Sequence, residues 1–247
     1  MKLQSEDIIA WLRTTYGDRP AVIAVSGGVD SALALTLLTK ALGTSRVYPL
    51  MLPYGEQDMA DAETIVDWNG VGEQATTWNI QSTVDQLAAE LGAKEPLRKG
   101  NLMARVRMIA VFDQAKKLGA LVCGTENKSE HYLGYFTRFG DAASDVEPLS
   151  RLYKTEVWAM AKELGLPAVF YTKAPSAGLW EGQADEVELG FSYQAADQVL
   201  SRLVDEGKTE LEVTRLLAPS LGRATVERIL AVVAQNAFKR VVPYELF

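Results

Sequence analysis

The sequence predicts an α/β fold, with a doubly wound parallel sheet flanked by helices and a helical part toward the C-terminus. Short apolar runs with little polar alternation recur through the first half, as expected for strands buried on both faces of a parallel sheet. A helical pattern follows each run, and this alternation is typical of right-handed crossovers. Strand signals end after Cys123, while helical patterns continue.

The first half contains the expected strands and the helices that connect them. We expect strands over residues 20–25, 46–52, 75–80 and 120–123. We expect helices over residues 30–42, 58–68, 82–91 and 101–118. The first of these helices should stop at Gly43, because glycine commonly ends helices.

The second half should be mostly helical. A polar, glycine-bearing segment over residues 124–150 precedes expected helices at 154–164, 192–206, 210–217 and 224–237. Residues 173–191 show no clear periodicity, and a segment of this length is more often a functional loop or lid than a passive connector.

Composition excludes several classes of protein. The chain has 247 residues, a net charge of −7 and a pI near 4.9, which argues against a protein that coats nucleic acid. Its one cysteine, Cys123, cannot form an intrachain disulfide or a zinc cluster, and its one histidine, His131, leaves no multi-histidine metal site. No apolar run reaches the roughly 18 residues of a membrane helix, and the N-terminus is not a secretory signal. We expect a cytoplasmic protein with neither membrane nor nucleic acid as a partner.

A glycine-rich turn joins the first strand to the first helix. Gly27 and Gly28 let the backbone turn sharply, and the helix start offers unpaired N–H groups that suit a phosphate. Ser26 and Ser31 add hydroxyl donors. Asp30 would repel a phosphate directly, but a divalent cation between them removes this objection. The alternative is a tight turn in which Asp30 or Ser31 only caps the helix.

Further motifs follow in order along the chain. Two arginines, Arg105 and Arg107, lie on different faces of a predicted helix, and a polar segment follows the strand that ends at Cys123. The other motifs are Gly-Thr-Glu-Asn-Lys-Ser-Glu at 124–130, Gly-Tyr-Phe-Thr-Arg-Phe-Gly-Asp at 134–141, Asp145, Leu-Tyr-Lys-Thr at 152–155, Lys-Ala-Pro-Ser-Ala-Gly-Leu-Trp at 173–180, Leu-Gly-Phe-Ser-Tyr at 189–193 and Phe-Lys-Arg at 238–240.

The turn over residues 26–31, Ser-Gly-Gly-Val-Asp-Ser, resembles the pyrophosphate loop of the ATP pyrophosphatase superfamily. With the other motifs in register, the chain resembles the short, ammonia-using NAD synthetases. The resemblance implies a single synthetase domain over 1–247, with a nucleotide-binding core of the adenine nucleotide alpha hydrolase type at about 18–170 and a lid and helical part at about 171–247. It implies that ATP adenylates the carboxylate of deamido-NAD, that ammonia then displaces AMP to give NAD, and that the protein is a homodimer.

The resemblance also assigns roles to residues. The ATP-binding set is Ser26, Gly27, Gly28, Val29, Asp30, Ser31, Ala32, Leu33, Thr125, Lys154 and Ser176, and the magnesium ligands are Asp30 and Glu130. The deamido-NAD set is Arg105, Arg138, Asp145 and Lys239, and the catalytic residues are Asp141, which would deprotonate ammonium, and Lys154. Hard carboxylate oxygens suit Mg²⁺, and a cation such as Lys154 suits the charge that develops on a phosphate.

Three positions depart from the family pattern. Arg138 replaces a lysine of many members and keeps the charge, and Ser176 replaces a threonine and keeps the hydroxyl. Phe238 stands where some members have histidine, so a contact there would depend on Lys239 alone.

The only thiol, Cys123, lies in a buried strand, where an activated nucleophile is not expected, so we expect free ammonia rather than glutamine as the nitrogen donor.

Other interpretations stay open. Lys154 could be a solvated surface lysine, Arg105 and Arg107 ordinary helix charges, and Asp145 a turn cap. His131 is interpreted as a packing or interface residue, and Trp180 as a packing residue or a cover for the site. The competing functions are another adenylating amidotransferase or ligase of the same superfamily, and a nucleotide-binding module without chemistry.

Overall fold

The computed structural model describes residues 3–176 and 182–241 of the chain. In this part of the chain the sheet has four parallel strands in the order β3-β2-β1-β4: β1 (Ala21–Ala24), β2 (Val47–Met51), β3 (Thr76–Thr77) and β4 (Leu121–Cys123). Ala21 at the start of β1 pairs with Val47 of β2 on one side and with Leu121 of β4 on the other. The predicted doubly wound parallel sheet is confirmed.

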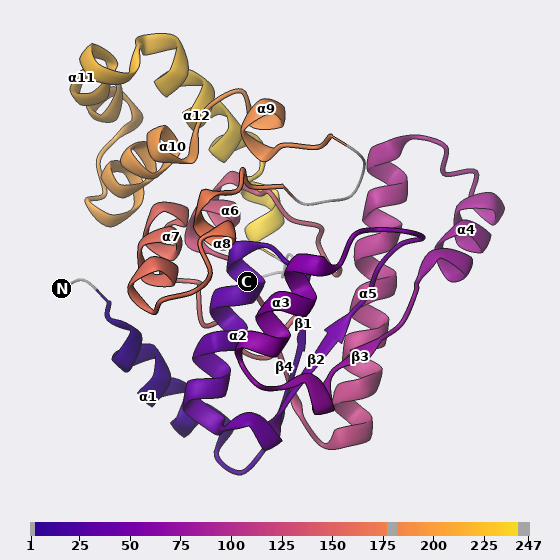
Figure 1. Cartoon of the computed structure of the whole chain (residues 1–247). Helices are drawn as coiled ribbons and strands as arrows, with labels where there is room; N and C mark the ends of the chain where they lie inside the picture. The colour runs from indigo at the N-terminus through magenta and orange to yellow at the C-terminus, as the bar shows by residue number, and fades with distance from the viewer. Residues whose placement is uncertain (1–2, 177–181, 242–247) are drawn as a thin grey trace, which may run out of the picture.

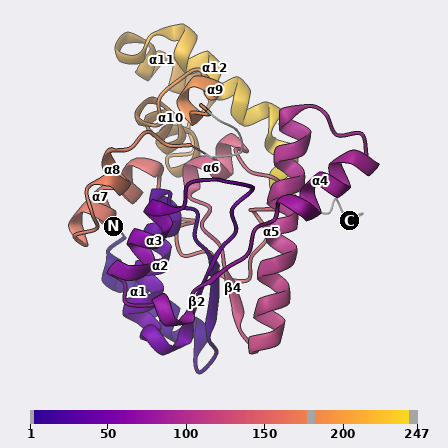
Figure 2. The same ribbon diagram turned by 45° about the vertical axis from the view of Figure 1, so that its right-hand side comes forward.

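Helices cover both faces of the sheet (Figures 1 and 2). On one face lie α1 (Ser5–Tyr16), α2 (Val29–Leu42) and α3 (Ala60–Trp68), and on the other lie α4 (Gln81–Glu90) and α5 (Pro96–Leu118). Alternate residues of β1 face opposite sides of the sheet. Ile23 packs in the hydrophobic cluster that contains α2, and Val22 packs in the cluster that contains α5.

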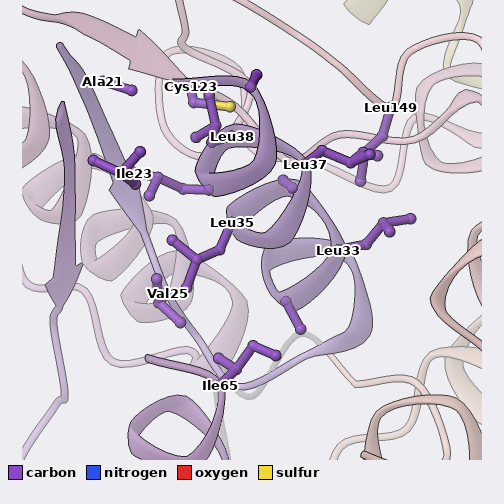
Figure 3. Packing of buried hydrophobic residues seen from close by; sticks show 14 of the residues in the cluster. Ala21, Ile23, Val25, Leu33, Leu35, Leu37, Leu38, Ile65, Cys123 and Leu149 are labelled. Atoms are coloured by element: carbon purple, nitrogen blue, oxygen red, sulfur yellow. The ribbon is translucent and has the colours of Figure 1, made fainter. Parts of the chain in front are cut away.

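The helix α2 lies in the middle of the main hydrophobic core. Figure 3 shows Ile23 of β1 and Val25, which follows the strand, beside Leu35 of α2, and Ile65 of α3 nearby. On another side of the same helix, Leu37 faces Leu149. The sequence of α2 is apolar almost all round, as expected for a helix that is packed on several sides. Its first residues directly follow the glycine turn and are anchored by this packing.

The helices toward the C-terminus form a second hydrophobic cluster. They are α9 (Asp185–Leu189), α10 (Tyr193–Leu200) with a π turn at Ser201–Asp205, α11 (Glu210–Leu221) and α12 (Arg223–Gln235), followed by a 3-10 turn at Ala237–Arg240. Leu133 of α6 (Lys128–Leu133) and Tyr153 before α7 (Lys154–Glu163) belong to the same cluster. This cluster therefore includes residues from both sides of the boundary predicted near residue 171.

Several elements differ from the expectations. Helices α1, α6 and the one-turn α8 (Val169–Thr172) were not predicted, and α5 begins at Pro96 instead of residue 101. The strand expected over residues 75–80 is reduced to the two exposed residues of β3. Within the described residues, no helix combines the length and the apolar character that crossing a membrane requires.

Candidate active site

A cavity of about 510 Å³ opens at the carboxyl ends of the strands, where parallel α/β sheets bind ligands. Its wall combines the glycine turn after β1, the segment after β4, the middle of α5 and residues of the C-terminal part. Of the predicted site residues, the wall includes Ser26, Gly28, Asp30, Ser31, Thr125, Glu130, Asp141, Lys154, Ser176 and Lys239.

The glycine turn has a conformation that only glycine allows. Gly27 has a φ of +84°, and a Cβ added there would lie 3.0 Å from the backbone nitrogen of Ala62 in α3. The Ser31 hydroxyl donates to the Gly28 carbonyl oxygen over 3.0 Å, and the Ser26 N–H donates to the Ser31 oxygen over 3.3 Å. The turn is thus braced from within, and the N-terminus of α2 faces the cavity.

The first turn of α2 serves both the cavity and the core. Asp30 and Ser31 line the cavity, whereas the side chains of Val29, Ala32 and Leu33 are buried among apolar residues. The last three could reach ATP only through their backbone.

The structure brings Asp30, Glu130 and Lys154 together, although 124 residues separate the first from the last. The ammonium nitrogen of Lys154 lies 2.6 Å from Asp30 Oδ2 and 2.8 Å from Glu130 Oε1. Lys154 is 2% exposed, which overturns the interpretation of a solvated surface lysine. Asn127, which sequence reasoning missed, donates from Nδ2 to Asp30 Oδ1 over 2.8 Å.

Burial and charge shape the protonation of this cluster. Burial raises the pKa of Glu130, with Lys154 opposing the shift and Asp30 adding to it. Burial alone would lower the pKa of Lys154, but Asp30 and Glu130 outweigh it and hold that pKa above its usual value. Lys154 is therefore a permanent cation that lies between two carboxylates beside the glycine turn.

The two carboxylates fit a magnesium site. Both belong to the hard oxygen ligands that Mg²⁺ prefers, and Mg²⁺ typically takes one or two of them together with phosphate oxygens and water. Because Asp30 and Glu130 both contact the ammonium group of Lys154, the fold already directs both carboxylates toward one positive charge.

Asp141 lies on the cavity wall with its side chain open to the cavity. The Thr137 N–H donates to its Oδ1 over 3.0 Å, which fixes the carboxylate. Desolvation by the surrounding protein raises the pKa of Asp141, and the hydrogen bonds from Thr137 oppose this shift. A carboxylate with a raised pKa is better suited to accept a proton than an ordinary surface aspartate.

The four residues predicted to contact deamido-NAD do not share one cavity. Arg138 and Lys239 line a second hollow of about 340 Å³, whose wall also includes His131. The Lys239 ammonium donates to the carbonyl oxygens of Gly134 and Phe136 over 2.6 and 3.0 Å. Arg105 is exposed and reaches the Arg138 carbonyl oxygen. Asp145 accepts from the Val122 N–H over 2.8 Å at the edge of β4, which is a local structural role.

Arg107, for which an ordinary surface charge was an open interpretation, is instead part of the cavity wall. Its guanidinium donates to the Leu52 carbonyl oxygen and to Gln57 Oε1, both over 3.0 Å. It thereby holds the segment after β2 against α5. The sequence signal was its spacing of two from Arg105, which placed the two arginines on different faces.

Part of the predicted lid lies outside the described residues, including Gly178 and Trp180. On its N-terminal side, Lys173 pairs with Asp61 of α3. On its C-terminal side, Gln183 and Glu188 line the cavity, and both lie within hydrogen-bond distance of the Tyr135 hydroxyl.

Comparison with known proteins identifies the family of this chain. The NAD synthase family model matches residues 4–243. The NH3-dependent NAD(+) synthetase of Pyrococcus horikoshii is 42% identical over 240 residues, which are 96% of this chain and 91% of that protein. That of Pyrococcus furiosus is 44% identical over 224 residues, 90% of this chain and 86% of that protein.

Solved structures are similar over nearly the whole chain. The NMN synthetase from Francisella tularensis superposes with a TM-score of 0.83 at 33% identity, covering 98% of this chain and 96% of that chain. The NH3-dependent NAD synthetase from Campylobacter jejuni, solved with a nitrate ion, superposes with a TM-score of 0.81 at 28% identity, covering 98% and 97%. From the glycine turn, the carboxylate pair with its lysine and these matches, we conclude that the chain belongs to the NAD synthase family.

Proposed function

We propose that the protein is a ligase that amidates the nicotinate carboxylate of deamido-NAD with free ammonia to give NAD, while ATP is cleaved to AMP and pyrophosphate. The observation that carries the proposal is the meeting of Asp30, Glu130 and Lys154 beside the phosphate turn, in a chain of this family. A nucleotide-binding module without chemistry would not need a buried lysine between two carboxylates, since such a cluster is costly to desolvate.

In the first step, a carboxylate oxygen of the substrate attacks the α-phosphorus of ATP, and pyrophosphate leaves. The glycine turn and the N-terminus of α2 would hold phosphate oxygens through backbone N–H groups, aided by the hydroxyls of Ser26, Ser31, Thr125 and Ser176. Lys154 would lie close to the charge that develops on the phosphate. Bound Mg²⁺, held by Asp30 and Glu130, would neutralise further phosphate charge.

In the second step, ammonia attacks the carbonyl carbon of the acyl-adenylate, and AMP leaves with the electron pair of the broken C–O bond. Ammonium is the main form near neutral pH and has no free electron pair, so a proton must first be removed. Asp141, open to the cavity and with a raised pKa, is the residue we assign to this task.

The residues predicted to bind deamido-NAD suggest the arrangement of the whole protein. Arg105 and Arg138 lie outside the wall of the main cavity, although the resemblance assigns both to the deamido-NAD site. We therefore propose a homodimer in which a second copy completes the deamido-NAD site. A cytoplasmic location fits a reaction that consumes ATP.

A mononucleotide substrate is the second candidate, favoured by the likeness to the Francisella NMN synthetase. The same chemistry would then convert nicotinate mononucleotide to NMN, because the reacting carboxylate is the same in both molecules. The two candidates differ only in whether an adenylate half is attached to the substrate.

One assay tests these proposals. The purified protein is given ATP, Mg²⁺ and an ammonium salt, with either the dinucleotide or the mononucleotide. We expect NAD, AMP and pyrophosphate in equal amounts from the dinucleotide, with a higher kcat/KM than for the mononucleotide. Formation of ADP, or no turnover of either carboxylate, would contradict the proposed function.

A further inference from the structure

The helix α7 carries Lys154 as its first residue. Its own Glu156 accepts from the N–H of the N-cap residue over 3.0 Å, but two of its first N–H groups are capped by other helices. Its N-cap residue is Tyr153, whose side chain makes no capping hydrogen bond. The first N–H groups of a helix have no partner within the helix and must be satisfied elsewhere. Here the Lys154 N–H donates to the Ser129 hydroxyl oxygen over 2.8 Å, and the Thr155 N–H donates to Asp197 Oδ2 over 2.9 Å.

The two acceptors, Ser129 and Asp197, are hydrogen-bonded to each other. The Ser129 hydroxyl donates to Asp197 Oδ1 over 2.5 Å, so both oxygens of Asp197 are used for the start of α7. Ser129 is fully buried and Asp197 is 6% exposed. Asp197 comes from α10, Ser129 from α6, and the three helices pack against one another. An anion from the C-terminal part therefore caps the helix that carries the cavity lysine.

The position of this cap matters for the site. Ser129 precedes Glu130 in the chain and binds the backbone of Lys154, so a single hydroxyl anchors both partners of the ion pair. The Lys154 ammonium must reach Asp30 and Glu130 from a backbone held in this place. A shift of about 1 Å in a positioned group can cost about a hundredfold in rate.

We propose that Asp197, acting through Ser129 and the first turn of α7, is a positioning residue that sets the place of Lys154 relative to Asp30 and Glu130. The proposal rests on the proposed function for its effect on turnover, but its structural part does not. Asp197 does not line the cavity, so it acts only through the residues that it holds.

The chain offers a matched control in Asp205. This aspartate lies in the turn after α10. It accepts a hydrogen bond over 2.9 Å from the hydroxyl of Tyr153, the residue before α7, and it pairs with Lys128, the first residue of α6. Unlike Asp197, it accepts no bond from the backbone of Lys154 or Thr155. Asp197→Asn and Asp205→Asn therefore make the same chemical change at two neighbouring places.

The first measurement reads the position of Lys154 without any substrate. An amine-reactive reagent modifies exposed lysines, and mass spectrometry reports the rate at each one. We expect Lys154 to react slowly in the wild type and about tenfold faster in Asp197→Asn, since loss of one charged hydrogen bond corresponds to about this factor. The rate should stay within about twofold in Asp205→Asn.

The second measurement is the steady-state release of pyrophosphate. We expect kcat of Asp197→Asn to fall by about 10- to 100-fold while KM for deamido-NAD changes less than about twofold. Ser129→Ala, which removes only the link between Asp197 and Lys154, should change both readouts in the same direction by a smaller factor. This variant also serves if Asp197→Asn fails the folding control by circular dichroism.

A double-mutant cycle separates positioning from general destabilisation. Adding Asp197→Asn to Lys154→Met should lower the remaining rate by less than about twofold, because the positioned group is already absent. The proposal is overturned if a folded Asp197→Asn leaves the labelling of Lys154 unchanged, or if Asp205→Asn raises it equally. If the wild type fails to turn over deamido-NAD, the proposed function fails, and the labelling result still decides the positioning role.

Discussion

At the scale of single residues, the site depends on opposite charges brought close together in a protected place. Asp30 and Glu130 each follow a buried strand of the sheet, and Lys154 joins them from α7. Neutralising one carboxylate leaves Lys154 with a single charged partner and removes one of the two hard oxygen ligands offered to a cation. The amide variants Asp30→Asn and Glu130→Gln test this with little change in shape.

We expect either amide variant to release pyrophosphate about 100- to 1,000-fold more slowly, because a charged contact to the reacting phosphate is lost. A higher Mg²⁺ concentration should restore part of the rate, since the ligand is weakened and not abolished. Circular dichroism controls for folding, and Asp113→Asn on the exposed side of α5 is the matched control. Near-normal release by a folded variant would mean that its carboxylate only caps a helix.

Asp141 gives a prediction that depends on pH. Because its pKa is raised, the ability of its carboxylate to accept a proton should be lost as the pH falls through that raised value, and not at the lower pH of an ordinary aspartate. In Asp141→Asn, amination should depend on ammonia that is already free. The free fraction grows about tenfold per pH unit while ammonium predominates.

The defect of Asp141→Asn should therefore be largest just above the raised pKa of Asp141. The ratio of wild-type to variant kcat/KM for ammonium should fall toward one as the pH rises, because free ammonia becomes available, and also as the pH drops below that pKa, because the wild-type carboxylate is then protonated. A ratio that stays constant across pH would show that Asp141 does not handle the proton. Pyrophosphate release before amination should change little in a single-turnover measurement, which separates the two steps.

At the scale of elements, local signals predicted the sheet and most helices, while contacts between distant elements could not be predicted. The strand β1 and the helix α2 were predicted because their apolar patterns are strong. The helix α1 was missed although Ile8, Leu12 and Tyr16 mark one buried face at a helical spacing. Helix α6 has only six residues, so its capping pair, Asn127 and Glu130, was the only available signal.

The site was predicted in part for the same reason. Asp30 and Glu130 could be placed at one edge of the sheet, because parallel strands end there together. That Lys154 lies between them depends on the packing of α7 against α2 and α10, which has no signature in the local sequence. Asp197 did have one: it lies on the buried face of α10 at positions 193, 196, 197 and 200, where an acidic side chain needs a partner.

The junction of α6 and α12 provides a prediction about stability. Gly134 ends α6 with a φ of +66°, and a Cβ added there would lie 2.3 Å from the Cβ of Asn236. Gly119 ends α5 with nearly the same backbone, φ +63°, and has no atom within 4 Å of an added Cβ. Both alanine variants should lose about 1 kcal/mol in the free energy of unfolding, because alanine is strained in the left-handed conformation.

Gly134→Ala adds a clash between two elements, so its free energy of unfolding should fall by at least about 1 kcal/mol more than that of Gly119→Ala. Urea unfolding followed by circular dichroism measures the difference. Equal losses in the two variants would mean that α12 can move away from α6 at no cost.

At the scale of the whole molecule, the C-terminal helices lie beyond one end of the sheet (Figure 1), and residues from both parts of the chain line the cavity. The core side supplies the glycine turn to the cavity wall, and the C-terminal part supplies Gln183, Glu188 and Lys239. The two hydrophobic clusters are joined through α7, because Trp158 packs against both. The C-terminal helices are therefore in direct contact with the helix that carries Lys154.

A second copy of the chain is the partner expected near the second hollow. Phe139 and Phe238 are 60% and 45% exposed, and their rings lie 5.9 and 5.2 Å from the Arg138 guanidinium. Phe139 also has a φ of +56°, an uncommon conformation for a bulky residue that places a large apolar ring toward solvent. Exposed aromatic rings beside an arginine are typical of protein interfaces.

We expect light scattering to give a mass of twice 27.0 kDa for the wild type. Phe139→Asp should shift the mass toward that of one chain, because it places a charge in the proposed interface. Leu211→Asp is the matched control, since Leu211 is also 60% exposed but lies on α11. The monomeric variant should still bind ATP at its own cavity, but its KM for deamido-NAD should rise at least about tenfold, since each site would lack the partner's contribution. A fully active monomer would show that one chain builds the whole site, and that Arg105 and Arg138 bind substrate without a second copy.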